Sequence, residues 1–330
     1  MSDSVVVIET GAGNTKYTAS KGGQIVAAGH LPSIVALCGA GALASFQGER
    51  QTDEVMPVVN GVTYKVSLSA NRGVAGATRV APGDDFQNSA HHAALMAAGL
   101  YAAGLKEIDV LVVGTPVHTF NKHRDYLSSI RGTLDFGLGS HTIGTTIVLP
   151  QPFGSLLAGI NEGNLINSAR NAQIVIDVGY YSTDVLRARG LTLEHANSFG
   201  LAAGMGKIYQ MFADLVAQKI RQPVSDLDQI EHCLRTRTPY VVYGQQVYLE
   251  SYMQEIQAYL DSCALEIYGR VGTIENVALI CLTGGGAEFF RPAIRKVFGD
   301  IPIQVMPDPL MANARGFLVA GLAALANRAA

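Results

Sequence analysis

The chain has 330 residues, 48% of them hydrophobic and 15% charged, and its 24 Lys and Arg against 27 Asp and Glu leave a net charge of −3. Single hydrophobic cores stop growing at roughly 250 to 300 residues, so this length predicts two domains. The charge balance excludes a strongly basic DNA-gripping surface, no apolar run approaches the ~20 residues that span a bilayer, and four scattered cysteines without CxxC spacing fit the cytoplasm.

Short β-branched runs alternate along the chain with alanine- and leucine-rich segments of helical period, which indicates an α/β architecture. We predict strands at 5–10, 109–117, 173–179 and 276–286, and helices at 91–105, 206–220, 248–271 and 314–330. The stretches at about 30–82 and 221–248 interrupt this pattern with Gly- and Pro-containing loops and strand-like runs. Each is therefore predicted to be a small insertion on one of the two domains.

One element occurs twice. VVIETGAGNTKY aligns with IVIDVGYYSTDV at one constant offset, so that Glu9, Gly11 and Thr15 coincide with Asp177, Gly179 and Thr183. In both copies an apolar strand ends in a carboxylate, turns through glycine and continues as a second strand. Such a hairpin can turn backbone N–H groups toward one point, which suits an anion. Two facing hairpins would hold a polyphosphate from both sides, and the carboxylates would hold Mg²⁺ through its waters.

Other phosphate-binding patterns fit less well. The segment GAGNTK lacks the third glycine of GxGxxG, and GLAAGMGKI misses the spacing of GxxxxGK[ST]. A single acid-x-Gly turn is most often only a hairpin, so the phosphate hypothesis depends on the two copies occurring together.

The order of five segments carries a family resemblance. IETGAGNTKY, LPQPFGSLLAG, IDVGYYSTDVL, SFGLAAGMGKIY and CLTGGGAEFF resemble the phosphate 1, connect 1, phosphate 2, connect 2 and adenosine motifs of the actin-like ATPase superfamily. Within it, the chain is most similar to the ParM/StbA plasmid-segregation proteins. The resemblance spans nearly the whole chain and implies an α/β, actin-like (ribonuclease H-like duplicated) fold with two domains flanking a nucleotide cleft.

The resemblance also implies domain boundaries. Domain I would comprise residues 1–165 with the first insertion, and domain II would comprise residues 166–306 with the second. Residues 307–330 would form a C-terminal helix that returns to domain I.

ATP or ADP with Mg²⁺ are the cofactors that the resemblance implies. Lys16 would bind the β- and γ-phosphates and Gln151 would position the attacking water. Glu9 and Asp177 would be catalytic and would hold the metal through waters. The implied nucleotide-binding residues are Gly11, Gly13, Asn14, Thr15 and Lys16 in the first hairpin, Gly179, Ser182 and Thr183 in the second, and Lys207, Gly284, Gly285, Gly286 and Glu288 around the nucleoside. For Gln151 and Lys207 a solvated surface position stays the alternative.

Glu9 departs from the family pattern, which has aspartate there. The extra methylene moves the carboxylate about 1.5 Å further into the site, where catalytic groups must be held within roughly 0.5 Å. We therefore expect nucleotide binding with slow hydrolysis.

Three functions stay open at this stage, since one fold can host many activities. The first is a cytoplasmic ATPase that polymerises head to tail and segregates plasmid DNA through a DNA-binding adaptor protein, without direct nucleic acid or membrane contact. The second is a metabolite kinase, for which we find no second acid placed as a sugar kinase's base. The third is a nucleotide-regulated scaffold with little hydrolysis. The motifs leave the choice between ATP and GTP open.

Overall fold

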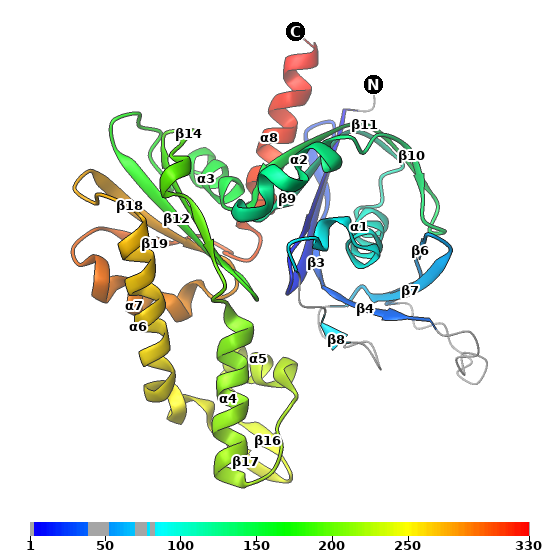
Figure 1. Ribbon diagram of the computed structural model, residues 1–330. Coiled ribbons are helices and arrows are strands. Elements are labelled where there is room, and N and C mark those ends of the chain that lie inside the picture. The colour runs from blue at the N-terminus through cyan, green and yellow to red at the C-terminus, as the bar shows by residue number, and fades with distance from the viewer. Residues whose placement is uncertain (1–2, 39–52, 70–77, 80–82, 330) are drawn as a thin grey trace.

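The two strands that end in carboxylates lie at the centres of two separate sheets. The computed structural model describes residues 3–38, 53–69, 78–79 and 83–329. Figure 1 shows the two sheets in different lobes. We call the lobe built around β1 (Ser4–Thr10) the first lobe and the lobe built around β12 (Ala172–Val178) the second lobe. Helices α3 (Gln151–Asn161) and α8 (Ala312–Ala329) lie between them. The predicted α/β fold with two domains is confirmed.

The first sheet is built around β1 (Ser4–Thr10), whose residues are all buried. It pairs antiparallel with β2 (Asn14–Lys21) and parallel with β9 (Glu107–Thr115). In the described ranges the strand order is β10-β11-β9-β1-β2-β3. The other strands are β3 (Gln24–Pro32), β10 (Gly132–Asp135) and β11 (Ser140–Pro150). A strand that is covered on both faces reads as a continuous apolar run, which explains VVVI.

The second sheet repeats this arrangement around β12 (Ala172–Val178), which pairs antiparallel with β13 (Thr183–Arg189) and parallel with β18 (Val277–Thr283). Across the described residues its order is β14-β13-β12-β18-β19, and β15 also pairs with β13. The additional strands are β14 (Thr192–Leu193), β15 (Phe199–Leu201) and β19 (Ile303–Val305). The sequence duplication is thus a duplication of sheet topology.

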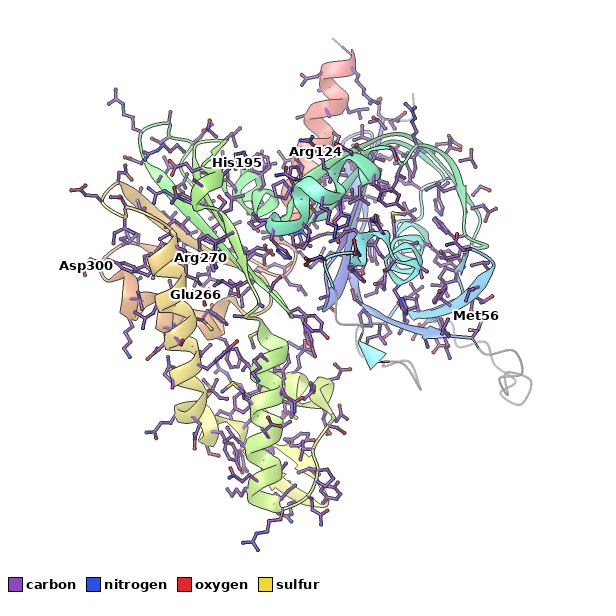
Figure 2. All side chains as sticks on the ribbon, viewed as in Figure 1. Met56, Arg124, His195, Glu266, Arg270 and Asp300 are labelled. Carbon is purple, nitrogen blue, oxygen red and sulfur yellow. The ribbon has the colours of Figure 1, made fainter. Side chains whose placement is uncertain are left out.

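Smaller units extend each lobe where the insertions were predicted. On the first lobe an outer sheet has the order β5-β7-β4-β8, with β6 paired to β7. Its strands are β4 (Ile34–Leu37), β5 (Glu54–Val55), β6 (Val58–Val59), β7 (Val62–Ser67) and β8 (Thr78–Arg79). Residues 39–52, 70–77 and 80–82 of the first insertion lie outside the described residues. Figure 2 shows Met56 at the outer edge of this sheet. On the second lobe, α5 lies with the hairpin of β16 (Tyr240–Val242) and β17 (Gln245–Val247).

The helices occupy the segments with helical period. The α-helices are α1 (Ala90–Ala103), α2 (Phe120–Ser128), α3 (Gln151–Asn161), α4 (Met205–Ile220), α5 (Leu227–Thr236), α6 (Met253–Arg270), α7 (Ala287–Phe298) and α8 (Ala312–Ala329). Short 3₁₀ turns are η1 (Phe86–Asn88), η2 (Val117–Thr119), η3 (His195–Asn197) and η4 (Leu249–Tyr252). The helix predicted at 248–271 therefore begins as a 3₁₀ turn. Among the helices of the described ranges, none combines the length and apolarity needed to cross a bilayer.

Local signals explain where α1 begins and ends. The Ser89 hydroxyl accepts a hydrogen bond from the backbone N–H of His92, and Gly104 ends the helix at φ 75°. A serine cap satisfies one unpaired N–H of the first turn, and glycine adopts the left-handed conformation without steric cost.

Helices α3 and α8 exchange lobes. Helix α3 follows β11 of the first sheet, yet Leu156 packs with Val175 and Cys281 of the second. Helix α8 follows the second lobe, yet Phe317 packs with Val7 of the first. The packing therefore changes lobe at the start of each helix, whereas the domain boundaries at 165/166 and 306/307 stay predictions.

The two helices touch backbone to backbone where they cross. A Cβ added at Gly316 would overlap the carbonyl oxygen of Gly154, and one added at Gly154 would overlap the backbone of Asn313. Only glycine lets two helix axes approach this closely. The pair of glycines thus determines how near the two sheets, and the strand ends they carry, can come to each other.

We expect Gly316→Ala to destabilise the protein. The new methyl group would push α3 and α8 apart, at a cost of about 1–3 kcal/mol or more in the free energy of unfolding, as for other overpacked cores. Gly269→Ala is the matched control, because Gly269 lies in α6 with no atom within 4 Å of its added Cβ. The control should be neutral or stabilising by up to about 1 kcal/mol. Equal denaturant midpoints for the two variants would contradict the crossing as described.

Candidate functional site

The two hairpins have the same backbone hydrogen bonds. The N–H of Gly11 donates to the carbonyl of Asn14 at 3.1 Å, and the N–H of Gly179 donates to the carbonyl of Ser182 at 2.9 Å. A Cβ added at either glycine would lie about as close to that carbonyl, 2.9 Å from Asn14 O and 3.0 Å from Ser182 O. The turn therefore requires glycine for the same steric reason in both copies.

The threonines of the two hairpins are also both hydrogen-bonded, although to different groups. The Thr15 hydroxyl lies 2.9 Å from the hydroxyl of Ser33, and the Thr183 hydroxyl donates to the carbonyl of Ala203. Both threonines are completely buried. Their side chains thus anchor each hairpin to the following segment of its own lobe.

The tips of the two hairpins meet. A Cβ added at Gly13 would lie 2.9 Å from Cβ of Tyr180, which belongs to the second hairpin. Tyr180 in turn packs against Tyr209 of α4, with ring centroids 5.9 Å apart. Gly13 therefore provides the space that lets the first hairpin approach the second.

The carboxylates of Glu9 and Asp177 and the ammonium group of Lys16 form a cluster next to the two hairpins. Nζ of Lys16 lies 3.0 Å from Oε1 of Glu9, and both side chains are buried. This ion pair follows from register, because Glu9 and Lys16 are directly opposite in the β1–β2 ladder. Nδ2 of Asn313 donates to Oε1 of Glu9 at 3.2 Å and to Oδ2 of Asp177 at 2.7 Å. The carboxylates of the two lobes are thus connected through one amide.

Burial dominates the ionisation of this cluster. The pKa of Asp177 is raised to about 7, mainly by burial and also by the charge of Glu9, against the opposing effects of Lys16 and the Asn313 hydrogen bond. Burial alone would lower the pKa of Lys16, but the charges of Glu9 and Asp177 outweigh it, so that the pKa of the ammonium is raised. Lys16 is therefore cationic at neutral pH.

The side chain of Glu9 is one methylene longer than that of aspartate, and the neighbouring strand leaves space for it. A Cβ added at Gly114 would lie 3.1 Å from Cγ of Glu9 and would also overlap the ring of Phe317. The absence of a side chain at Gly114, on the neighbouring strand β9, thus accommodates the extra methylene.

The residues assigned to the nucleoside divide into two sets. Gly284 lies against the cluster, because its added Cβ would overlap Oδ1 of Asp177, whereas Gly285 has open space at that position. The N–H of Gly286 donates to the carbonyl of Val178 at 3.1 Å. Lys207 and Glu288 have exposed side chains in the first turns of α4 and α7. The structure therefore brings the glycines, but neither charged side chain, to the strand ends.

Gln151 occupies a defined place. It is the first residue of α3, directly after Pro150 at the end of β11, and its side chain is buried. The alternative of a solvated loop residue is therefore wrong.

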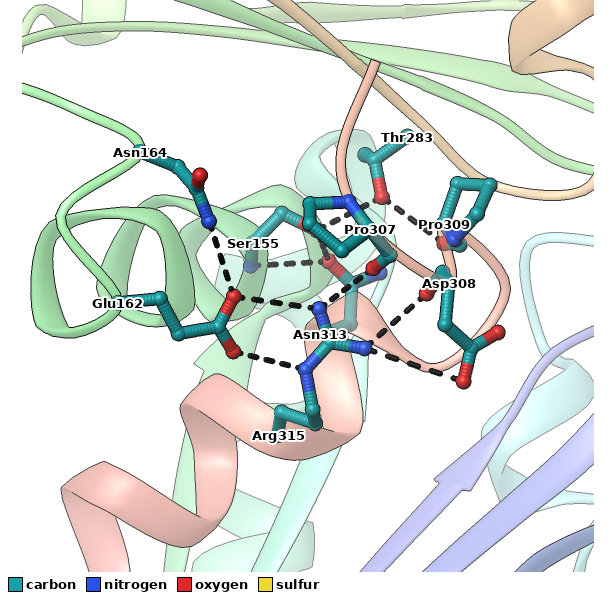
Figure 3. Close-up of polar contacts among 9 residues, drawn as sticks. All are labelled: Ser155, Glu162, Asn164, Thr283, Pro307, Asp308, Pro309, Asn313 and Arg315. Atoms are coloured by element: carbon teal, nitrogen blue, oxygen red, sulfur yellow. Dashed lines mark hydrogen bonds and ion pairs between the residues drawn. The ribbon is translucent and has the colours of Figure 1, made fainter.

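Sequence reasoning missed Asn313 and its neighbours. Asn313 lies in the first turn of α8 and is buried. Its Oδ1 accepts from the backbone N–H of Ser155 at 3.1 Å and from the Ser155 hydroxyl, which lies 3.0 Å from the hydroxyl of Thr283 (Figure 3). The only signal in the sequence is one asparagine between two alanines at the start of a helix, which does not distinguish a core amide from a surface residue.

A second contact joins the lobes through Asp184, which the strand register places opposite Asp177. Oδ1 of Asp184 accepts from the N–H of Val117 at 3.1 Å and lies 3.7 Å from Nδ1 of His118. Interaction with Asp184 raises the pKa of His118. The second hairpin therefore contacts the first lobe both through Asn313 and through η2.

Comparison with protein-family models matches each lobe. A model described as the N-terminal domain of actin like proteins matches residues 8–154. A model described as the C-terminal part of the archaeal actin homologue MreB-like proteins matches residues 175–296. Comparison with curated protein sequences gave no match.

Solved structures with the same fold cover nearly the whole chain. The crystal structure of Ta0583, an archaeal actin homologue, is 20% identical with a TM-score of 0.79, covering 97% of this chain and 99% of that one. Its complex with ADP is 21% identical with a TM-score of 0.75, covering 98% and 99%. A 15-stranded ParM filament from Clostridium botulinum is 19% identical with a TM-score of 0.74, covering 97% and 99%. The predicted actin-like fold is thereby confirmed, without singling out the ParM/StbA group.

We expect the stability of the metal- and nucleotide-free protein to fall as the pH rises from about 4 to about 7. In this range native Asp177 keeps a proton that the unfolded chain, with an ordinary carboxyl pKa of 3.8, has lost. Unfolding then releases a proton, so each pH unit costs up to about 1.4 kcal/mol. Urea unfolding in EDTA measures this slope, and Asp177→Asn should flatten it. An identical slope in parent and variant would show that Asp177 titrates normally.

Proposed function

We propose that the chain is an actin-like protein that binds ATP or ADP with Mg²⁺ at the two hairpins, hydrolyses ATP and assembles head to tail into filaments, because an actin-like family model matches each of its lobes. The observation that supports this most is the meeting of two equivalent hairpins, with Lys16 paired to Glu9 and with Glu9 and Asp177 joined by Asn313. The ADP complex of Ta0583 is a complex of a protein with this fold.

The residues present suit Mg²⁺. Oε2 of Glu9 is buried and has no hydrogen-bond partner among the described residues. An unpaired buried carboxylate oxygen is costly unless a ligand or water completes it. Carboxylate oxygens acting through water are also the donors that Mg²⁺ prefers, because this ion keeps much of its hydration shell. Glu9 and Asp177 would hold the ion, which when bound would neutralise charge on the phosphates.

The other side chains have separate tasks in this proposal. Lys16 binds the terminal phosphates, for which it must exchange part of its ion pair with Glu9 for a phosphate oxygen. Gln151 orients the attacking water. The backbone N–H groups of the two hairpins bind phosphate oxygens, since phosphoryl transfer depends on positioning and charge stabilisation.

The nucleoside lies beside the glycines that follow β18. Gly285 has no atom within 4 Å of an added Cβ, so this stretch leaves room for a ring against the backbone. Lys207 and Glu288, exposed on α4 and α7, would reach the nucleoside only by moving toward these glycines.

Self-association requires two different surfaces, because a head-to-tail contact joins unlike patches. Exposed apolar side chains gather at the end of the second lobe, at Val241, Tyr243 and Tyr248 on and beside the β16–β17 hairpin. On the outer sheet of the first lobe, Met56 and Val62 are also exposed. Apolar patches of this kind mark interaction sites. Two structures with this fold are those of filaments, from ParM and Alp12.

The cellular role that we propose is plasmid segregation in the cytoplasm, with a DNA-binding adaptor linking the filament to DNA. It is supported by the resemblance to ParM/StbA and by a net charge of −3, which does not favour direct DNA binding. A nucleotide-regulated scaffold is the outcome if nucleotide binds without turnover.

We expect Mg-ATP to cause filaments, seen by light scattering and negative-stain electron microscopy, and we expect the nucleotide-free protein to stay dispersed.

Glu9→Asp should hydrolyse ATP roughly tenfold faster or more, since a misplacement of 1 Å can cost about 100-fold in rate. Glu255→Asp, the same change at an exposed position of α6, is the control. Hydrolysis by Glu9→Asp no faster than that of the parent would count against the account of Glu9.

Val241→Asp should raise the critical concentration for assembly about fivefold or more, because a charge in an apolar contact is costly. ATP binding should be unchanged, since Val241 lies outside the two glycine-containing hairpins at β1–β2 and β12–β13. Ile166→Asp, at an exposed apolar position between α3 and β12, serves as the matched control. Assembly curves that coincide for the parent and both variants would remove the β16–β17 hairpin from the contact.

A further inference from the structure

Asn313 has contacts in both lobes at once. It lies on α8, where this helix crosses α3, and its side chain reaches the ends of β1 and β12. Ser155 of α3 holds the other end of the amide, and Thr283, next to Ser155, is the register partner of Asp177. One amide therefore connects two helices and two sheets.

The orientation of the amide is determined by its partners. A backbone N–H can only donate, so the atom that faces Ser155 N must be the oxygen of Asn313. The amide nitrogen must then face the carboxylates. Its two N–H groups match two acceptors, Oε1 of Glu9 and Oδ2 of Asp177.

The position of α8 makes this contact rigid. Arg315, two residues further on, pairs at 2.8 Å with Glu162, the residue directly after α3, and donates to the carbonyls of Pro307 and Asp308 (Figure 3). Together with the contact between Gly154 and Gly316, this leaves the first turn of α8 little freedom to move relative to α3. These contacts hold the backbone of Asn313 in place beside the two carboxylates.

We propose that Asn313 is a positioning residue that holds the carboxylates of Glu9 and Asp177 at a set separation across the two lobes, and thereby sets the affinity for Mg²⁺. The statement about Mg²⁺ rests on the proposed function, whereas the coupling of the two side chains to Asn313 does not. Two buried carboxylates repel each other, so an uncharged group that donates to both is suited to keep them together without neutralising either. Oε2 of Glu9 stays free of protein partners among the described residues and is available to a metal-bound water.

The first test is a polarity swap in the nucleotide-free protein. Asn313→Asp keeps the acceptor for Ser155 but places oxygens against both carboxylates, so it should lower the denaturant midpoint strongly. Adding Asp177→Asn restores a donor and an acceptor across the 2.7 Å contact and should recover at least half of the loss. If Asn313→Asp alone fails to fold, folding of the double variant is the positive result. A double variant no more stable than the sum of the two single changes would overturn the coupling.

The control for this swap is Gln210→Glu. Nε2 of Gln210 also donates to a carboxylate, Oδ1 of Asp214 at 2.8 Å, but on the surface of α4. It should change the midpoint little. A loss as large as that of Asn313→Asp would show that the effect is not specific to the buried contact.

The second test measures Mg²⁺ with Asn313→Ala. Binding of fluorescent ADP is titrated in EDTA and then with increasing Mg²⁺. We expect the affinity for ADP in EDTA to stay within about threefold of the parent, while the Mg²⁺ concentration for half-maximal enhancement rises about 10- to 100-fold, as for other groups that orient metal ligands. An unchanged Mg²⁺ requirement would leave Asn313 with a structural role only and overturn the proposal. If the parent itself binds no nucleotide, the proposed function fails, and the swap still decides the coupling.

Discussion

Two carboxylates from separate lobes share one buried amide, and the arrangement of the site depends on this contact. Unpaired buried charges are expensive, and two of like sign more so. Lys16 offsets part of this cost through its ion pair with Glu9, and Asn313 supplies a hydrogen bond to each carboxylate. The raised pKa of Asp177 shows that the compensation is incomplete.

The crossing of α3 and α8 makes the shared contact possible. Each helix follows the sheet of one lobe and packs on the sheet of the other. The point where Gly154 meets Gly316 therefore lies between the two lobes. Asn313 lies at this same point. The contact between the two helices and the contact that joins the two carboxylates are therefore close together. A second bridge, from Asp184 to η2, lies on the other strand of the hairpin and also joins the lobes.

Glu9 fits its surroundings, although the resemblance to actin-like ATPases predicts aspartate at this position. Gly114 leaves room for the Glu9 side chain, and Oε1 of Glu9 accepts hydrogen bonds from Lys16 and Asn313, while Oε2 has no hydrogen-bond partner in the described part of the chain. The substitution is thus accommodated by neighbours in β2, β9 and α8.

Features that depend on residues close together in the chain could be predicted from the sequence. Apolar runs that end in Glu9 and Asp177, each followed by a glycine, identify the strands and the repeated turn, because backbone pairing and glycine geometry are local requirements. The pairing of Lys16 with Glu9 could also have been read from the hairpin register. Tertiary structure alone decided the rest: that Gly13 lies under Tyr180, that Lys207 and Glu288 are exposed, and that Asn313 bridges both carboxylates. These contacts join segments from distant parts of the chain, brought together by two helices that exchange lobes, and no periodicity along the chain encodes such an exchange.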